Sequence, residues 1–118
     1  MENLISLLFL ARDVAHREHL HTSSYAQHVA LGSFYSDIID NADAITEAYQ
    51  GAYDKLPPIP IKAYTGSKGI VETLQSYLQW IKDNRYKVCS KEDTAIQNLI
   101  DEAVSTFQST LYKLRFLS

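Results

Sequence analysis

The chain has 118 residues, of which 46% are hydrophobic and 21% are charged, and its formal net charge is −3. A chain of this length is expected to bury ~65% of its unfolded surface, so residues 1–118 are predicted to form a single domain. The 14 acidic residues outnumber the 11 basic ones, which argues against strong binding to DNA. A lone cysteine, Cys89, excludes an internal disulfide and fits the cytoplasm.

Membrane association is not expected either. The longest apolar stretch, at residues 4–11, is much shorter than the ~20 residues that a spanning helix needs. A signal peptide is not expected, because Glu2 stands where such a segment would carry cations.

The first predicted helix covers about residues 2–19, because its apolar residues recur at spacings of three and four. They are Leu4, Leu7, Leu8, Ala11, Val14 and Ala15. The polar residues at 22–24, Thr-Ser-Ser, are suited to capping a second helix. That helix is predicted to continue to about Tyr49 and to stop at Gly51.

The second helix carries two neighbouring stripes when its residues are placed at ~100° intervals around the axis. The core stripe consists of Leu31, Phe34, Ile38, Ala42, Ile45 and Tyr49. The other stripe consists of His28, Gly32, Ile39, Asp43 and Glu47. Once the first stripe is buried in the core, the second has no predicted use within the chain, so we expect a two-fold dimer to bury it.

Residues 51–66 are predicted to form a long crossover, because the proline-rich segment 56–60 cannot continue a helix. The third and fourth helices are expected at about residues 68–86 and 91–116, the last of them capped by Ser90. Their stripes consist of Ile70, Leu74, Tyr77, Leu78 and Ile81, and of Ile96, Leu99, Ile100, Ala103, Val104, Phe107, Leu111 and Leu114. The pattern predicts an all-α four-helix bundle whose second and third helices run parallel.

Histidines and carboxylates are the candidate metal ligands, because they suit Fe(II) or Zn(II). They are His16, His19, His21 and His28, followed by Asp37, Asp40, Asp43 and Glu47. His28 and Asp43 share a stripe, but at ~1.5 Å per residue they lie more than ~20 Å apart along one helix. Two antiparallel copies, with a two-fold axis near residues 35–38, would bring His28 of one subunit level with Asp43 and Glu47 of the other.

These residues resemble the DNA-protecting-during-starvation (Dps) branch of the ferritin superfamily, the miniferritins. His16, His28, Asp43 and Glu47 fall at the spacings of that family, and residues 47–51, Glu-Ala-Tyr-Gln-Gly, are similar to its helix end. The resemblance implies a ferritin-like bundle that oxidises and sequesters iron at a metal site between two subunits. It also implies a homo-oligomer, either a dimer through the second helix or a twelve-subunit shell.

The chain also departs from that family. A carboxylate ligand of the family would fall at Gly32, and its lysine-bearing tail is absent. The family's His-Trp pair is replaced by His19-Leu20 or His16-Arg17, so either His16 or His19 is a candidate for the equivalent ligand. Residues 24–35, with Ser-Tyr-Ala-x-His followed by Ala-Leu-Gly-x-Phe-Tyr, further resemble compact ferritin-like sequences of tailed bacteriophages.

Three functions are therefore considered. The first is an iron-binding protein, with zinc as the other candidate metal, whose oxidation of Fe(II) is weakened by Gly32. The second is a non-enzymatic helical oligomer, a phage or host accessory or binding protein that has lost the ferroxidase centre. The third is a zinc site within one subunit, built from His16 or His19 together with His21 and His28.

Overall fold

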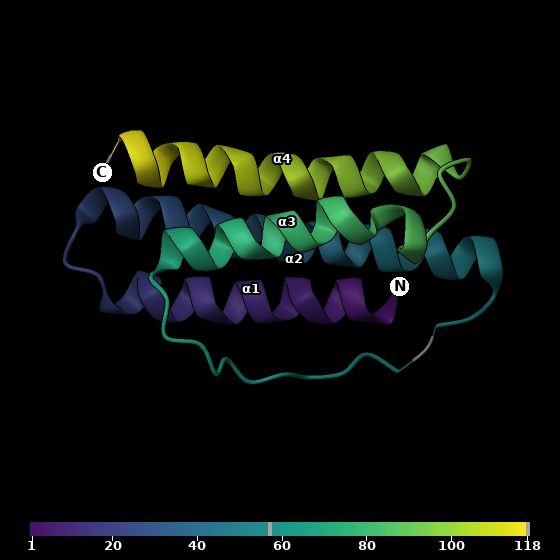
Figure 1. Ribbon diagram of the computed structural model, residues 1–118, viewed down its shortest axis with the longest axis horizontal. Coiled ribbons are helices and arrows are strands. Elements are labelled where there is room, and N and C mark those ends of the chain that lie inside the picture. Colours follow the sequence, from purple (N-terminus) through teal and green to yellow (C-terminus); the bar gives the residue numbers. More distant parts are fainter. Residues whose placement is uncertain (57, 118) are drawn as a thin grey trace.

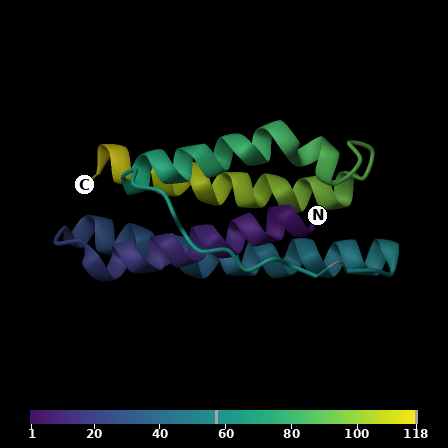
Figure 2. The same cartoon turned by 60° about the horizontal axis from the view of Figure 1, so that its bottom comes forward.

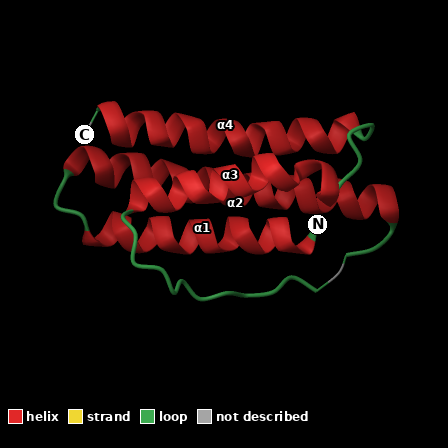
Figure 3. Cartoon of the chain, viewed as in Figure 1, coloured by secondary structure: helices red, strands yellow, loops and turns green. Residues whose placement is uncertain are grey.

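The computed structural model describes residues 1–56 and 58–117, which form four helices and no strand (Figure 3). The helices are α1 (Glu2–His21), α2 (Tyr25–Tyr53), α3 (Ile70–Val88) and α4 (Thr94–Phe116). The prediction of an all-α four-helix bundle is confirmed. One residue of the predicted crossover, Pro57, lies outside the described residues.

Each helix packs on two others around a shared core. α1 lies beside α2 and α3, and α4 lies beside the same two helices, whereas the described backbones of α2 and α3 do not approach each other closely. The α1–α2 hairpin forms one layer and the α3–α4 hairpin the other (Figure 2). α2 and α3 run in the same direction because the long segment between them returns along the bundle (Figure 1). The predicted crossover is therefore present.

The core is made of the apolar stripes that the helical spacing predicts. Most stripe residues are buried. The others are half-buried at the margin and pack against the core; they are Leu7, Tyr49, Ile70, Tyr77, Leu99 and Val104. The rings of Phe34 and Phe107 are fully buried and meet edge to face, with centroids 5.0 Å apart. This contact joins α2 to α4 at the centre of the bundle.

The predicted end of the second helix is wrong by about one turn. Gly51 continues α2, and the helix ends only at Tyr53, followed by the C-cap Asp54, whose φ of 56° lies in the left-handed region. The predicted cap at its start is confirmed, because the Oγ of Ser24 accepts a hydrogen bond from the Gln27 amide at 3.2 Å. The extra turn brings Tyr53 to the far end of the bundle.

The fourth helix begins later than predicted. Ser90 forms a turn instead of capping the helix: its Oγ accepts from the Glu92 amide and its carbonyl oxygen from the Asp93 amide. α4 therefore begins at Thr94, with Asp93 at the cap position.

The segment 54–69 is fastened to α1. The buried hydroxyl of Ser6 donates to the carbonyl oxygen of Pro60 at 2.6 Å. Further along, the guanidinium of Arg17 lies over the Tyr64 ring, 5.1 Å from its centroid. These contacts hold the connection, whose three prolines each lack a backbone donor, against the bundle.

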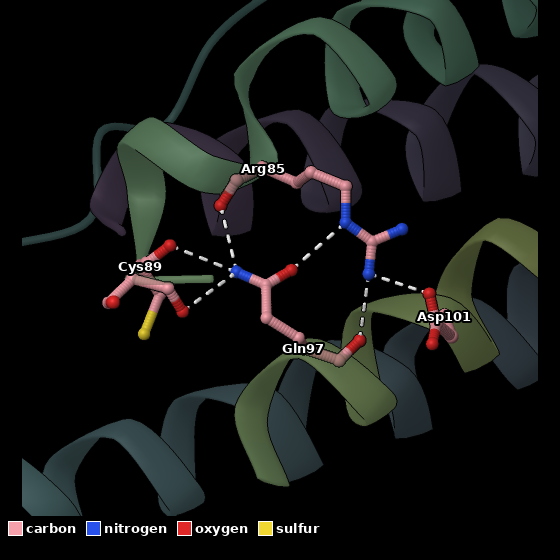
Figure 4. A network of polar contacts seen from close by, with 5 residues as sticks. Arg85, Cys89, Gln97 and Asp101 are labelled. Atoms are coloured by element: carbon pink, nitrogen blue, oxygen red, sulfur yellow. Dashed lines mark hydrogen bonds and ion pairs between the residues drawn. The ribbon is translucent and has the colours of Figure 1, made fainter. Parts of the chain in front are cut away.

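Gln97 connects the end of α3 to the start of α4 (Figure 4). Its Nε2 donates to the carbonyl oxygens of Arg85 and Cys89, at 3.1 Å and 2.9 Å. Its Oε1 accepts from Arg85 Nε at 2.9 Å, while Arg85 Nη2 donates to the Asp101 carboxylate. The Cys89 carbonyl lies just beyond α3 and has no partner within that helix, so Gln97 satisfies a group that α3 leaves open.

Candidate functional site

Three of the four histidines gather with Tyr35 where α1 ends and α2 begins. The rings of His19 and His28 stack with centroids 3.7 Å apart and planes inclined by 19°. The ring of His16 stacks on Tyr35 at 4.3 Å. His21, at the exposed end of α1, takes no part in these ring contacts.

His19 and His28 also exchange hydrogen bonds, and we call this pair the histidine clasp. His19 Nδ1 lies 2.6 Å from the carbonyl oxygen of His28, and His28 Nδ1 lies 2.8 Å from that of His19. A carbonyl oxygen only accepts, so both Nδ1 atoms donate and the Nε2 of a neutral ring keeps its lone pair. The His19 carbonyl belongs to the last turn of α1, so the clasp also caps that helix.

The clasp cannot chelate a metal ion in this arrangement. An imidazole nitrogen binds zinc in its ring plane at ~2.0–2.1 Å, and two stacked, nearly parallel planes do not meet at a point close to both Nε2 atoms. Within the described residues, no three His, Cys, Asp or Glu side chains could hold a metal. The zinc site predicted within one subunit is therefore not assembled among the described residues.

Asp43 and Glu47 lie on exposed turns of α2, well beyond the clasp. Neither carboxylate forms an ion pair with any residue that the structure describes. One chain does not bring them to His28, as the length of the helix requires. The metal site between two subunits remains a prediction.

Gly32 has a role within the chain that the sequence did not reveal. A Cβ placed there would lie 3.1 Å from Cε1 and 3.2 Å from Nδ1 of His19, so the ring lies directly against the glycine. Ile39, on the same stripe, is half-buried against the core. The prediction that this stripe has no use within one chain is wrong at these two positions, because the His19 ring of α1 lies against Gly32 and Ile39 packs against the core.

We expect Gly32→Ala to change the free energy of unfolding little, because two effects oppose each other. Alanine favours a helix by ~1 kcal/mol over glycine, but its methyl group must displace the His19 ring. In a His19→Ala background the same change should stabilise by about 1 kcal/mol. Urea unfolding of the four proteins of this cycle measures the coupling.

Gly51→Ala is the matched control for that cycle, since nothing lies within 4 Å of a Cβ added at Gly51. Its effect should be the same with or without the His19 ring. An equal effect of Gly32→Ala in both backgrounds would show that the clasp does not constrain Gly32.

A second polar cluster lies at the opposite end of the bundle. The Tyr53 hydroxyl donates to Asp93 Oδ2 at 2.6 Å, and the buried Cys89 thiol lies 3.6 Å from the same oxygen. The Tyr53 hydrogen bond lowers the pKa of Asp93, and burial raises the pKa of Cys89. A thiol with a raised pKa is a weak nucleophile, so we interpret the cluster as a fastening between α2 and α4.

This cluster predicts a contribution to acid sensitivity. Because the pKa of Asp93 is lower in the folded chain than the ordinary ~3.9, its contribution to stability is complete above that value and is lost as the pH falls through the folded pKa. Tyr53→Phe removes the main cause, so stability should fall less steeply in acid. Urea unfolding from about pH 6 down to about pH 3 tests this, and parallel curves would contradict it.

Two hollows between α2 and α4, which we together call the α2–α4 groove, were also missed by sequence reasoning. One hollow, of about 360 Å³, is lined mainly by apolar side chains of the first turns of α2 and the end of α4. A second, of about 320 Å³, lies between Asp37 and Asp40 on α2 and Glu102 on α4. Helix periodicity identified the buried faces, whereas this groove depends on which two helices become neighbours.

The chain is similar to one protein family and to a bacteriophage protein. The model of DUF5856, a family of unknown function, matches residues 19–114. An uncharacterized 14.6 kDa protein in the mobD-ri intergenic region of Enterobacteria phage T4 is 29% identical over 115 residues, which is 96% of this chain and 86% of that protein. No solved structure matches the chain. The T4 relative agrees with the predicted similarity to bacteriophage sequences.

Proposed function

The chain belongs to the DUF5856 family of unknown function, and from that premise we propose that it is a non-enzymatic helical oligomer on a ferritin-like scaffold. In this proposal the protein is a phage accessory protein that works by binding protein surfaces. The ferritin-like part of the proposal is supported by the single long crossover and the parallel direction of α2 and α3 (Figure 1).

The histidine clasp is the observation that carries this proposal. His19 and His28, two of the candidate ligands, donate their Nδ1 protons to each other's backbone and stack face to face. Gly32 stands where the ferritin resemblance expects a carboxylate, and it makes room for the His19 ring. The residues that would have formed a metal site are thus used to join α1 to α2.

An intersubunit iron or zinc site is the second candidate, and one observation favours it. Metal-binding histidines commonly donate their second nitrogen to a carbonyl, as His28 Nδ1 does. His28, Asp43 and Glu47 are all exposed, so a second copy has access to them. In this candidate they would hold the ion between subunits, together with His16 or His19.

Elemental analysis of the purified protein, together with its oligomeric mass, separates the two candidates. The non-enzymatic oligomer should contain no stoichiometric iron or zinc after incubation with either metal, and a chelator should not change its mass. About one ion per site, lost in His28→Ala or Glu47→Gln but kept in the control Glu72→Gln, would contradict it in favour of the metal site.

A further inference from the structure

The groove between α2 and α4 changes character along its length. At the end formed by the start of α2 and the end of α4, three exposed apolar side chains line it: Tyr25 is 81% exposed, Val29 47% and Leu117 56%. The next hollow along the groove is lined by Asp37, Asp40 and Glu102. One groove therefore has an apolar end and an acidic middle.

The charges of the two parts are opposite. Among the described residues, Lys113 is the one charged residue that lines the apolar hollow, whereas the acidic hollow is lined by three carboxylates and no cation. Neither Lys113 nor these carboxylates form an ion pair within the described chain. If a second copy lies over this surface in the antiparallel direction, the charges of the two copies are complementary.

We infer that a second copy of this chain docks on the α2–α4 groove, in antiparallel orientation about a two-fold axis. This inference rests on the proposed function and specifies which surface makes the oligomer. A two-fold contact uses the same patch on both copies, so each Lys113 meets the acidic hollow of the other copy.

The register follows from the contacts within one chain. Thr106 donates to Asn41 Oδ1 at 2.8 Å, which places Glu102 about one turn further from the apolar end. With the axis crossing the groove at the level of residue 35, Lys113, seven residues beyond Thr106, comes within about one turn of both Asp37 and Asp40 of the second copy. Tyr25, with a phenol that can donate, then comes level with Glu102 of that copy.

The size of the groove suits a modest interface. A face of two helices about 30 Å long and about 20 Å wide covers ~600 Å² on each copy, or ~1,200 Å² in total. This is the lower end of the range for stable complexes, so the dimer should dissociate at micromolar concentrations and weaken with salt. The proposed dimer contact lies on the side of α2 that faces α4. It is therefore a different surface from the Gly32 stripe, through which the sequence predicted a dimer.

Charge reversal in the full chain tests the inference by sedimentation velocity over a range of concentrations. Lys113→Glu alone, and Asp37→Lys with Asp40→Lys, should each weaken the dimer at least about tenfold, because like charges then face each other. An equal mixture of the two variants should restore a dimer, since both contacts between unlike chains become attractive. Lys87→Glu, on the exposed end of α3, is the matched control and should not change the mass.

The outcomes separate this inference from the proposed function. A dimer that survives both reversals, or variants that stay monomeric when mixed, would overturn the α2–α4 interface while leaving an oligomer on another face. A monomer at every concentration in the unsubstituted protein would overturn both proposals. Circular dichroism of each variant confirms that the helices remain folded.

Discussion

Replacing Phe107 with alanine is expected to lower the free energy of unfolding by ~3–5 kcal/mol, which is a large part of the stability of a domain of this size. The ring is fully buried and meets Phe34 edge to face across the α2–α4 contact. Removing it leaves a cavity that the surrounding helices cannot fill. It also removes an aromatic pair worth ~0.5–1.5 kcal/mol beyond its buried area.

Urea unfolding at one fixed protein concentration measures this effect, because association would otherwise alter the apparent stability. Ile61→Ala, at a side chain that is 77% exposed, is the control and should stay within ~0.5 kcal/mol of the unsubstituted protein. Phe107→Leu, which keeps more of the volume, should cost less than alanine. A loss of less than ~1 kcal/mol in Phe107→Ala would show that the α2–α4 core is not tightly packed.

The sequence predicted the core because burial of a helix face leaves a regular trace in the chain. Leu31, Phe34 and Ile38 recur at spacings of three and four, and all three are fully buried. The crossover was predictable for a different reason, since proline cannot continue a helix. These are local rules, and they identified four helices and their order without any knowledge of which helices become neighbours.

The histidine clasp was not predictable in the same way. Spacing placed His19 near the end of one helix and His28 near the start of the next, but their reciprocal hydrogen bonds depend on how closely α1 approaches α2. That approach depends on Gly32, which from sequence alone was interpreted as a missing ligand. The sequence did contain one indication of this contact. Gly32 lies within the second helix, and the first helix ends with several histidines, so a ring could pack against the glycine.

The groove between α2 and α4 was missed for a related reason. Asp37, Asp40 and Glu102 come from two helices far apart in the sequence, and only their packing places them around one hollow. Considered on one helix, the two aspartates form an ordinary exposed face. Non-local arrangement therefore determines the surface on which our proposals depend, while local periodicity determines the core beneath it.

Gln97 is a buried polar residue of α4 that joins this helix to the end of α3. It is only 6% exposed, and its side chain bonds both to the backbone at the end of α3 and to the guanidinium of Arg85. Gln97→Leu keeps a similar volume but leaves the Cys89 carbonyl and Arg85 Nε without their Gln97 partners. Because each unsatisfied buried group costs ~1–3 kcal/mol, we expect a loss of about 3 kcal/mol in the free energy of unfolding.

Gln97→Glu separates the two halves of the network. The carboxylate keeps an acceptor for Arg85 and strengthens that contact, but it replaces the Nε2 donor with an oxygen that faces the carbonyls of Arg85 and Cys89. If the donor is what joins α3 to α4, this variant should also be clearly destabilised. Gln75→Leu, on an exposed position of α3, is the control. Unchanged urea unfolding of Gln97→Glu would instead assign the whole role to the contact with Arg85.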